Sequence, residues 1–166
     1  MKRGKEGKRL IHHKPVKLNY SKIKTEIMEN PNVKLTKEIH DNFSSNQFEK
    51  CANLAAPNVE ITAHAFGMTF KGKQEFGHFM QGFKQAFPDM VIRHDSIVGN
   101  GNKVAVEFTA TGTHTGPLKT PNGDIPPSGK KVNLKVAEFY EWENGHFTKM
   151  KNYQDAADLM RQIGAM

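Results

Sequence analysis

Alternating apolar and polar residues dominate the second half of the chain. Near its end, the residues of one alternating set (Glu138, Tyr140, Trp142) interleave with those of another (Ala137, Phe139, Glu141). A period of two is typical of a pleated strand, whose successive side chains point to opposite faces. Asn144-Gly145 follows, a pair that tolerates positive φ and strongly favours a hairpin. We therefore predict strands at Lys131–Trp142 and His146–Lys151, then a helix at Asp155–Ile163.

The first half of the chain carries helical spacing. Apolar residues from Leu35 to Leu54 recur at helical intervals, and Ser44-Ser45-Asn46 divides this stretch into two short helices. A half-buried strand follows, with Val59, Ile61 and Ala63 on its apolar face. The remaining predictions are a short helix at Tyr20–Glu29, a helix at Lys73–Ala86, strands at Met90–Val98 and Lys103–Thr113, and a Gly/Pro loop at His114–Lys130. The Phe76, Phe79, Met80 and Phe83 stripe of the second long helix indicates core packing.

Helices followed by a run of strands predict an α+β fold. We expect a curved, mostly antiparallel sheet with the helices on one face. Residues 1–34 are predicted to be a basic extension, partly disordered or a short helix, and residues 35–166 a single domain.

The positive charge of the chain belongs to its N-terminal arm. The net charge is +7, and residues 1–17 carry seven Lys/Arg against one acid, which leaves only +1 for the remainder. A nucleic-acid-binding domain would concentrate basic groups on its folded surface. We therefore expect no specific nucleic-acid partner, and interpret the arm as a solvated extension.

The sequence argues against disulfide bonds, metal sites, membrane spans and two common catalytic or phosphate-binding motifs. The single cysteine, Cys51, excludes an intrachain disulfide, favours a cytoplasmic protein, and is expected to be a core residue. The histidines do not have the helical spacing of a metal site, so we predict no metal. No apolar run approaches the length of a membrane span, and neither a phosphate-binding loop nor a serine nucleophile motif is present.

Three segments taken together resemble a known family. They are AFPDMVIRHDSIVGNGNKVAVEFTATGTHTG, PPSGKKV and NGHFTKMKNYQDAADLMRQIG, in this order and spacing. They are similar to the SnoaL-like polyketide cyclase / ester cyclase family, within the nuclear-transport-factor-two-like, ketosteroid-isomerase-like superfamily. The resemblance runs from about Leu35 to the C-terminus. It implies a cone-shaped fold with an internal apolar pocket, and an aldol ring closure that needs neither metal nor organic cofactor.

The resemblance also implies a catalytic residue. Asp155, ten residues after Gly145, falls where the family carries its catalytic aspartate. The same residue heads a helix, where an acid also serves as an N-cap. Glu138 stands where relatives carry a histidine; it points either outward or into the pocket. If it points inward, we expect Glu138 and Asp155 to form the catalytic pair, two carboxylates that share a proton.

Removing a proton next to a carbonyl needs a base in a water-poor pocket and a donor for the enolate oxygen. The candidate substrate-binding residues are His64, Phe66, His114, Tyr140 and Trp142. His64 is equally suited to a structural hydrogen bond, and His114 to organising its loop. The other histidines, including His40 and His94, are interpreted as exposed or structural.

Three functions fit these observations. The first is an acid/base enzyme, of the cyclase, isomerase or lyase type, acting on a small apolar carbonyl or ester compound. The second is a non-catalytic module that binds a small apolar molecule in the same pocket. The third is an interaction protein that dimerises through the outer face of its sheet. We expect a homodimer or higher homo-oligomer and no membrane association.

Overall fold

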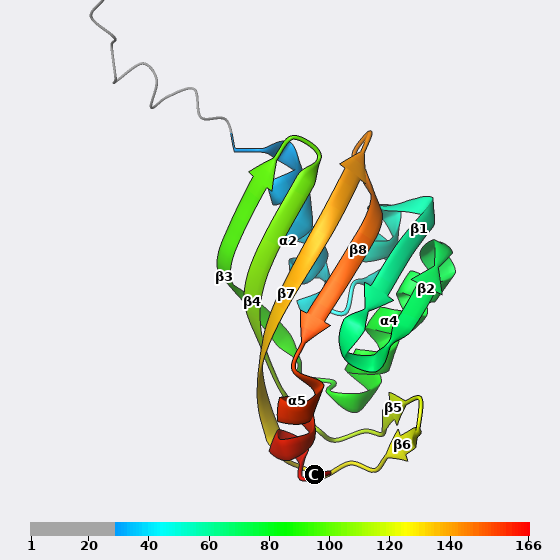
Figure 1. Cartoon of the computed structure of the whole chain (residues 1–166), viewed down its shortest axis with the longest axis vertical. Helices are drawn as coiled ribbons and strands as arrows, with labels where there is room; N and C mark the ends of the chain where they lie inside the picture. The colour runs from blue at the N-terminus through cyan, green and yellow to red at the C-terminus, as the bar shows by residue number, and fades with distance from the viewer. Residues whose placement is uncertain (1–28) are drawn as a thin grey trace, which may run out of the picture.

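The computed structural model describes residues 29–166. The basic arm and nearly all of the helix predicted at Tyr20–Glu29 lie outside the described residues. The helices are α2 (Pro31–Ser44), α3 (Phe48–Asn53), α4 (Gly72–Ala86) and α5 (Ala156–Ile163), with a 3₁₀ turn, η1 (His64–Phe66). The strands are β1 (Ala55–Ala63), β2 (Met68–Lys71), β3 (Val91–Asn100), β4 (Lys103–Thr113), β5 (Leu118–Thr120), β6 (Gly123–Ile125), β7 (Lys131–Glu143) and β8 (His146–Gln154) (Figure 1).

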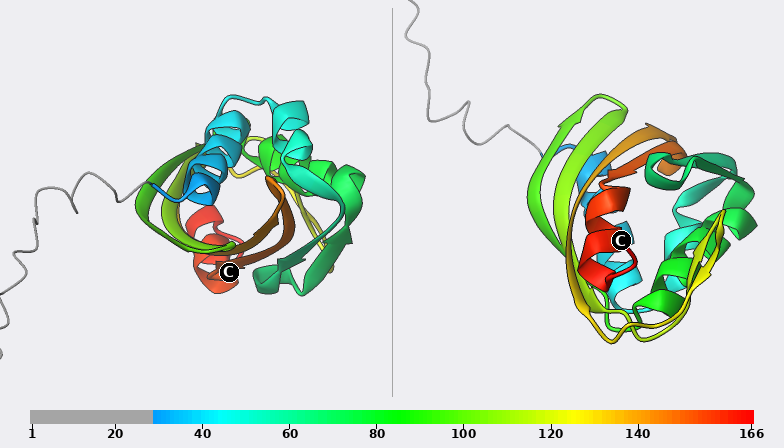
Figure 2. Two further views of the ribbon diagram at one scale, coloured as in Figure 1. Left: turned by 90° about the horizontal axis from the view of Figure 1, so that it is seen from above. Right: turned by 60° about the horizontal axis from the view of Figure 1, so that its bottom comes forward.

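Six strands form one curved sheet in the order β2-β1-β8-β7-β4-β3. All neighbouring pairs are antiparallel except β1 and β8, which run parallel. Seen from above, the sheet curls around α2, α3 and α4, which cover its concave face (Figure 2). The α+β prediction, with helices on one face of a mostly antiparallel sheet, is confirmed.

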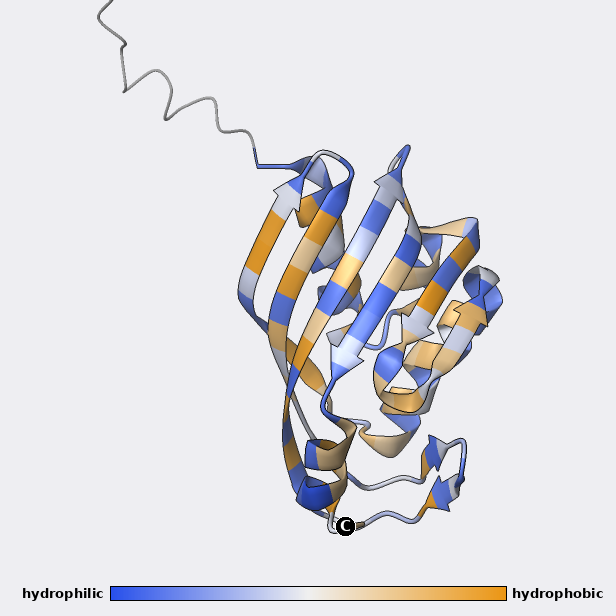
Figure 3. Ribbon diagram, viewed as in Figure 1, coloured by the Kyte–Doolittle hydropathy of each residue, from blue (hydrophilic) through white to orange (hydrophobic). Residues whose placement is uncertain are grey.

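The alternation along β7 sorts its residues as predicted. Glu138, Tyr140 and Trp142 are buried, whereas Phe139 is 49% exposed on the outer face. Figure 3 shows the same alternation as bands of opposite hydropathy along the strands. The hairpin turn has φ of 50° at Asn144 and 78° at Gly145, both in the left-handed region that favours this dipeptide.

One irregularity changes which residues of β3 face inward. His94 pairs with Phe108 and Ser96 pairs with Glu107, so Asp95 is an extra residue on its strand. Such a bulge shifts the alternation by one position. As a result Ile92 and His94 on one side of the bulge, and Ile97 on the other, are the partly buried residues of this strand.

Three short segments differ from the predictions, and one of them is the strand β2 (Met68–Lys71), which was not predicted. The predicted strand with Val59, Ile61 and Ala63 is β1. It ends at Ala63 because His64 starts the 3₁₀ turn, so His64 does not belong to the strand. The predicted loop His114–Lys130 contains the small β5–β6 hairpin, which lies beyond the end of the main sheet, with β5 near α4 (Figure 1). Three-residue strands are too short for hydrophobic alternation to reveal them.

The core fills the space between the sheet and the helices. Cys51, Phe76, Phe87, Phe147 and Leu159 are each at most 1% exposed, and the predicted core role of Cys51 is confirmed. The loop after β4 is fixed against the end of α4, because the backbone amides of Thr115 and Gly116 both donate to the Ala86 carbonyl at 3.1 Å.

We predict that Gly116→Ala destabilises the fold. A Cβ atom at this position would lie 1.9 Å from the Gln85 carbonyl oxygen, so the loop must move away from α4. The expected loss is about 1–3 kcal/mol, the usual cost of overpacking, measured by chemical denaturation. Gly77→Ala is the control: its Cβ meets nothing within 4 Å, and a gain of up to about 1 kcal/mol is expected in a helix. Equal stability of Gly116→Ala and the wild type would contradict this packing.

Candidate functional site

A cavity of about 60 Å³ lies between α2, α4 and the concave face of the sheet. Its walls are mainly apolar, and α4 contributes Phe76, Phe79, Met80 and Phe83. The polar lining residues come from α2 and from the two central strands: His40, Glu138, Tyr140, Asn152 and Gln154. The polar groups are therefore concentrated on one part of an otherwise apolar wall.

Glu138 is the centre of the polar group. Its residue is 5% exposed, and it pairs in register with Asn152 on the neighbouring strand. The Asn152 amide donates to Glu138 Oε1 at 2.8 Å, and the Tyr140 hydroxyl donates to Oε2 at 2.5 Å. Residues two apart on one strand share a face, which is why β7 supplies both the acid and its hydroxyl donor.

Helix α2 adds a third partner. His40 Nε2 lies 3.0 Å from Glu138 Oε2 and 3.2 Å from the Tyr140 hydroxyl oxygen. His40 Nδ1 lies 2.8 Å from His94 Nε2 on β3. When His40 carries protons on both nitrogens, it donates one to Glu138 and the other to His94. His94, His40 and Glu138 then form a continuous hydrogen-bonded chain into the cavity.

The electrostatics of this group favour an ionised carboxylate. Burial by itself raises the pKa of Glu138, but the hydrogen bond and charge of His40, together with Tyr140 and Asn152, outweigh it and lower the pKa from its ordinary 4.5. Burial, and then the Glu138 charge, raise the pKa of Tyr140 well above 10, so its hydroxyl stays a donor. Burial and the neighbouring charge of His40 lower the pKa of His94, which matches its position as the acceptor of the chain.

Within residues 29–166, two buried polar atoms beside the cavity have no hydrogen-bond partner. They are Asn152 Oδ1 and Gln154 Nε2, on residues that line the cavity two positions apart on β8. Buried polar atoms without partners are uncommon in folded proteins. An unpartnered acceptor and an unpartnered donor beside Glu138 therefore suit a polar group of a bound molecule.

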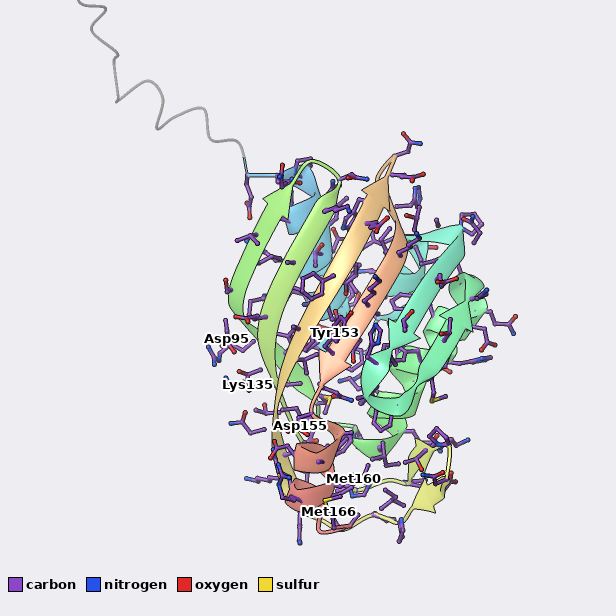
Figure 4. The ribbon with its side chains drawn as sticks, viewed as in Figure 1. Asp95, Lys135, Tyr153, Asp155, Met160 and Met166 are labelled. Atoms are coloured by element: carbon purple, nitrogen blue, oxygen red, sulfur yellow. The ribbon has the colours of Figure 1, made fainter. Side chains whose placement is uncertain are left out.

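The structure brings together two of the residues singled out from the sequence. Glu138 points into the cavity, which decides between its two alternatives, and Tyr140 donates to it. Asp155 lies elsewhere, at the junction of β8 and α5 (Figure 4). Its side chain is 65% exposed and caps α5 by accepting from the Asp158 amide at 3.0 Å. Asp155 does not line the cavity, and the structure does not pair it with Glu138.

The other four candidates have different surroundings. His64 is exposed and stacks on Tyr153, with ring centroids 4.2 Å apart. Trp142 is buried behind Tyr140, with ring centroids 6.2 Å apart. His114 is buried and organises its loop, with Nδ1 3.1 Å from Ser128 Oγ. Phe66 is partly buried and lines a groove on the far side of α4. None of these four side chains lines the cavity.

Four residues of the site were not predicted from the sequence: His40, His94, Asn152 and Gln154. A usable signal existed for His40, because it stands four residues after Thr36 and three before Phe43, on the buried face of α2. Asn152 could also have been predicted, since it lies two residues after Met150 and therefore shares its face of the strand. His94 required knowledge of the bulge and of how α2 packs on β3.

The described residues contain no cluster of three or more His, Cys, Asp or Glu arranged to hold a metal ion. Within the same part of the chain, no helix is long and apolar enough to cross a membrane.

Solved structures share this fold across most of the chain. A putative SnoaL-like polyketide cyclase from Jannaschia sp. CCS1 is 20% identical, with a TM-score of 0.73 over 81% of this chain and 92% of that one. IdmH, a putative polyketide cyclase from Streptomyces antibioticus, is 21% identical, with a TM-score of 0.67 over 79% of this chain and 96% of that one. TerC, co-crystallised with polyporic acid, is 16% identical, with a TM-score of 0.64 over 81% of this chain and 99% of that one. No curated protein sequence matches the chain.

The family assignment comes from the sequence itself. The family described as SnoaL-like polyketide cyclase matches residues 34–163. This range contains the whole sheet, every lining residue of the cavity and the Glu138 hydrogen-bond network. The resemblance noted in the sequence is thus confirmed, and the chain belongs to the SnoaL-like polyketide cyclase family.

Proposed function

We propose that this protein is an acid/base enzyme that acts without a cofactor on a small apolar carbonyl or ester compound. One observation carries the proposal: the buried carboxyl group of Glu138, which has hydrogen-bond contacts with three side chains, lies on the wall of an apolar cavity beside unpartnered polar atoms. The putative cyclase relatives and the co-crystallised TerC support a small organic molecule as the ligand.

The groups present are suited to proton abstraction. The Glu138 carboxylate takes the proton from the carbon next to the substrate carbonyl, and the C–H electron pair becomes the enolate. Gln154 Nε2, which has no hydrogen-bond partner among the described residues, donates to the enolate oxygen. In a ring closure the enolate carbon then attacks a second carbonyl of the same molecule, and the resulting alkoxide takes the proton back from Glu138.

The lowered pKa of Glu138 limits which substrates react. A carboxylate that accepts three hydrogen bonds is a weak base, so its proton must come from an acidic carbon. A carbon between two carbonyl groups has this property. We therefore propose a 1,3-dicarbonyl compound, such as a β-keto ester, as the substrate class.

The same weak basicity favours a second candidate. A non-catalytic module would use the charge of Glu138 and the unpartnered amide groups only to orient a ligand. Ligand binding without turnover in the wild type distinguishes this function from the first.

A homodimer is proposed from the outer face of the sheet. Val98, Phe139 and Tyr153 are 63%, 49% and 40% exposed there, and the last two rings make an edge contact. Exposed aromatic residues grouped on one face are typical of interfaces. Sedimentation of the wild type and of Phe139→Glu tests this assignment. We expect the wild type to be a dimer and the variant a monomer, and a monomeric wild type would contradict it.

We predict that Glu138→Gln abolishes most turnover. The variant keeps the side-chain shape and removes the base, so a loss of about 10²–10⁴-fold is expected. The measurement is exchange of the activated C–H for deuterium in a panel of apolar β-keto esters, followed by NMR. Exchange at the wild-type rate in Glu138→Gln would contradict the proposal, as would no exchange above buffer in the wild type.

Asp155→Asn is the matched control and tests the catalytic role implied by the family resemblance. Asparagine caps a helix about as well as aspartate, so the fold should be retained. If Glu138 is the sole base, this variant keeps wild-type exchange. Loss of exchange in Asp155→Asn, with Glu138 intact, would instead support Asp155 as the catalytic acid/base group.

We also predict an acidic limb at low pH in the exchange rate. The reaction needs ionised Glu138, whose folded pKa is lowered below its ordinary 4.5. The rate should therefore be independent of this group above about pH 5, and fall as the pH drops through the folded pKa. Circular dichroism at each pH checks that the fold persists. A half-maximal rate near pH 6 or above would show that Glu138 is not the ionised base.

A further inference from the structure

A second hollow lies on the other side of α4. It is a groove of about 340 Å³ formed by α4, β2, η1 and β5. Aromatic and other apolar side chains make up much of its lining, including Phe66, Met68, Phe70 and Leu118. The charged or titratable lining residues are Lys119 and His78, and His78 also contacts Glu75 at 3.2 Å.

Two side chains of α4 belong to both hollows. Phe79 and Phe83 line the internal cavity and also the groove. Their rings make an edge contact at 5.5 Å between centroids. The ring centroid of Phe70 lies 5.3 Å from that of Phe79, and the ring centroid of Phe66 lies 6.3 Å from that of Phe83. The four rings therefore form a continuous row.

The internal cavity is too small for a substrate with two carbonyl groups. A volume of about 60 Å³ holds a few water molecules, whereas ligand pockets usually measure about 300–1,000 Å³. The groove is large enough but has none of the Glu138 network. Each hollow therefore supplies what the other lacks: the cavity the chemistry, the groove the space.

The wall between them can move without rearranging the backbone. Phe79 and Phe83 are only partly buried, on the face of α4 between the two hollows. A change of side-chain rotamer needs no backbone rearrangement, and the exposed part of each ring faces open space. Rotation of these two rings toward the groove would join the two volumes.

We propose that the cavity and the groove are one composite binding site, with Phe79 and Phe83 as the gate between them. This inference rests on the proposed function for the carbonyl end of the ligand. The substrate is an elongated, apolar carbonyl compound. Its reactive end lies beside Glu138 and Gln154, and its apolar tail lies in the groove against Phe66 and Phe70.

The groove can be filled without touching the cavity. Gly82 lines the groove, and a Cβ atom added there meets nothing within 4 Å. Gly82→Leu therefore places a side chain in the groove. Gly77→Leu is the matched control, because Gly77 lies in the same helix, has equally open space and lines neither hollow. Gln81→Phe, from an exposed groove residue, is a second blocking variant if Gly82→Leu fails to fold.

Binding can be followed with the natural fluorophore. Trp142 is the single tryptophan and stacks on Tyr140, which lines the cavity. The probe is 2-acetylnaphthalene, an apolar methyl ketone larger than the cavity, measured by energy transfer from Trp142. We expect the wild type and Gly77→Leu to bind it equally, and the blocking variants to bind at least about tenfold more weakly, or about 1.4 kcal/mol. Phe83→Ala should bind it faster than the wild type.

The inference is overturned if the blocking variants bind as well as Gly77→Leu, if Phe83→Ala leaves the association rate unchanged, or if the wild type shows no saturable binding. Probe binding needs no proton transfer, so Glu138→Gln should show the same dependence on the groove. If only the proposed function is wrong, there is no turnover, but probe binding still depends on the groove. If only the composite site is wrong, turnover is seen, but probe binding does not depend on the groove.

Discussion

The carboxyl group of Glu138 lies on the wall of a largely apolar cavity, and the arrangement of the site follows from the three side chains that hydrogen-bond it. An isolated carboxylate in such a place would take up a proton, because burial penalises the charged form. Three donors from three elements prevent this: Tyr140 on β7, Asn152 on β8 and His40 on α2. Removing one partner of such a buried pair usually costs about 3–5 kcal/mol. The network therefore ties α2 to the centre of the sheet.

The fold meets this requirement through register. Glu138 lies opposite Asn152 because the Asn144-Gly145 turn fixes how β7 and β8 pair. A slip of one residue would turn Glu138 to the outer face, where its donors could not follow. The bulge at Asp95 has a similar role on β3, since it lets His94 and Ile97 both turn inward. Turn and bulge together place the second histidine beside the first.

Much of the fold followed from local patterns. The two helices before β1, the long helix with its Phe/Met stripe, and the four long strands from β3 onward all have a strong period and clear turn residues. The β5–β6 hairpin was missed because three residues carry no period. The inward direction of Glu138 was open from the sequence, since β7 alternates equally well with either acid inside. Only the neighbouring strands and α2 decide it.

The site was less predictable than the fold for a related reason. Tyr140 and Glu138 share one strand, so their common face could be read from the spacing. His40 and His94 are 54 residues apart, and only packing of α2 on β3 joins them. Asp155 attracted attention through the family resemblance, and its local sequence also suits a helix cap, the role it has in the fold.

Glu138 is expected to be ionised inside its apolar cavity. Isotope-edited infrared spectroscopy, comparing the wild type with Glu138→Gln at pH 6, measures this directly. Ionised Glu138 contributes a carboxylate stretching band that is missing from the variant, and this band is the expected result. A protonated carboxyl C=O band at pH 6 would contradict it, because the three donors would then fail to hold the charge.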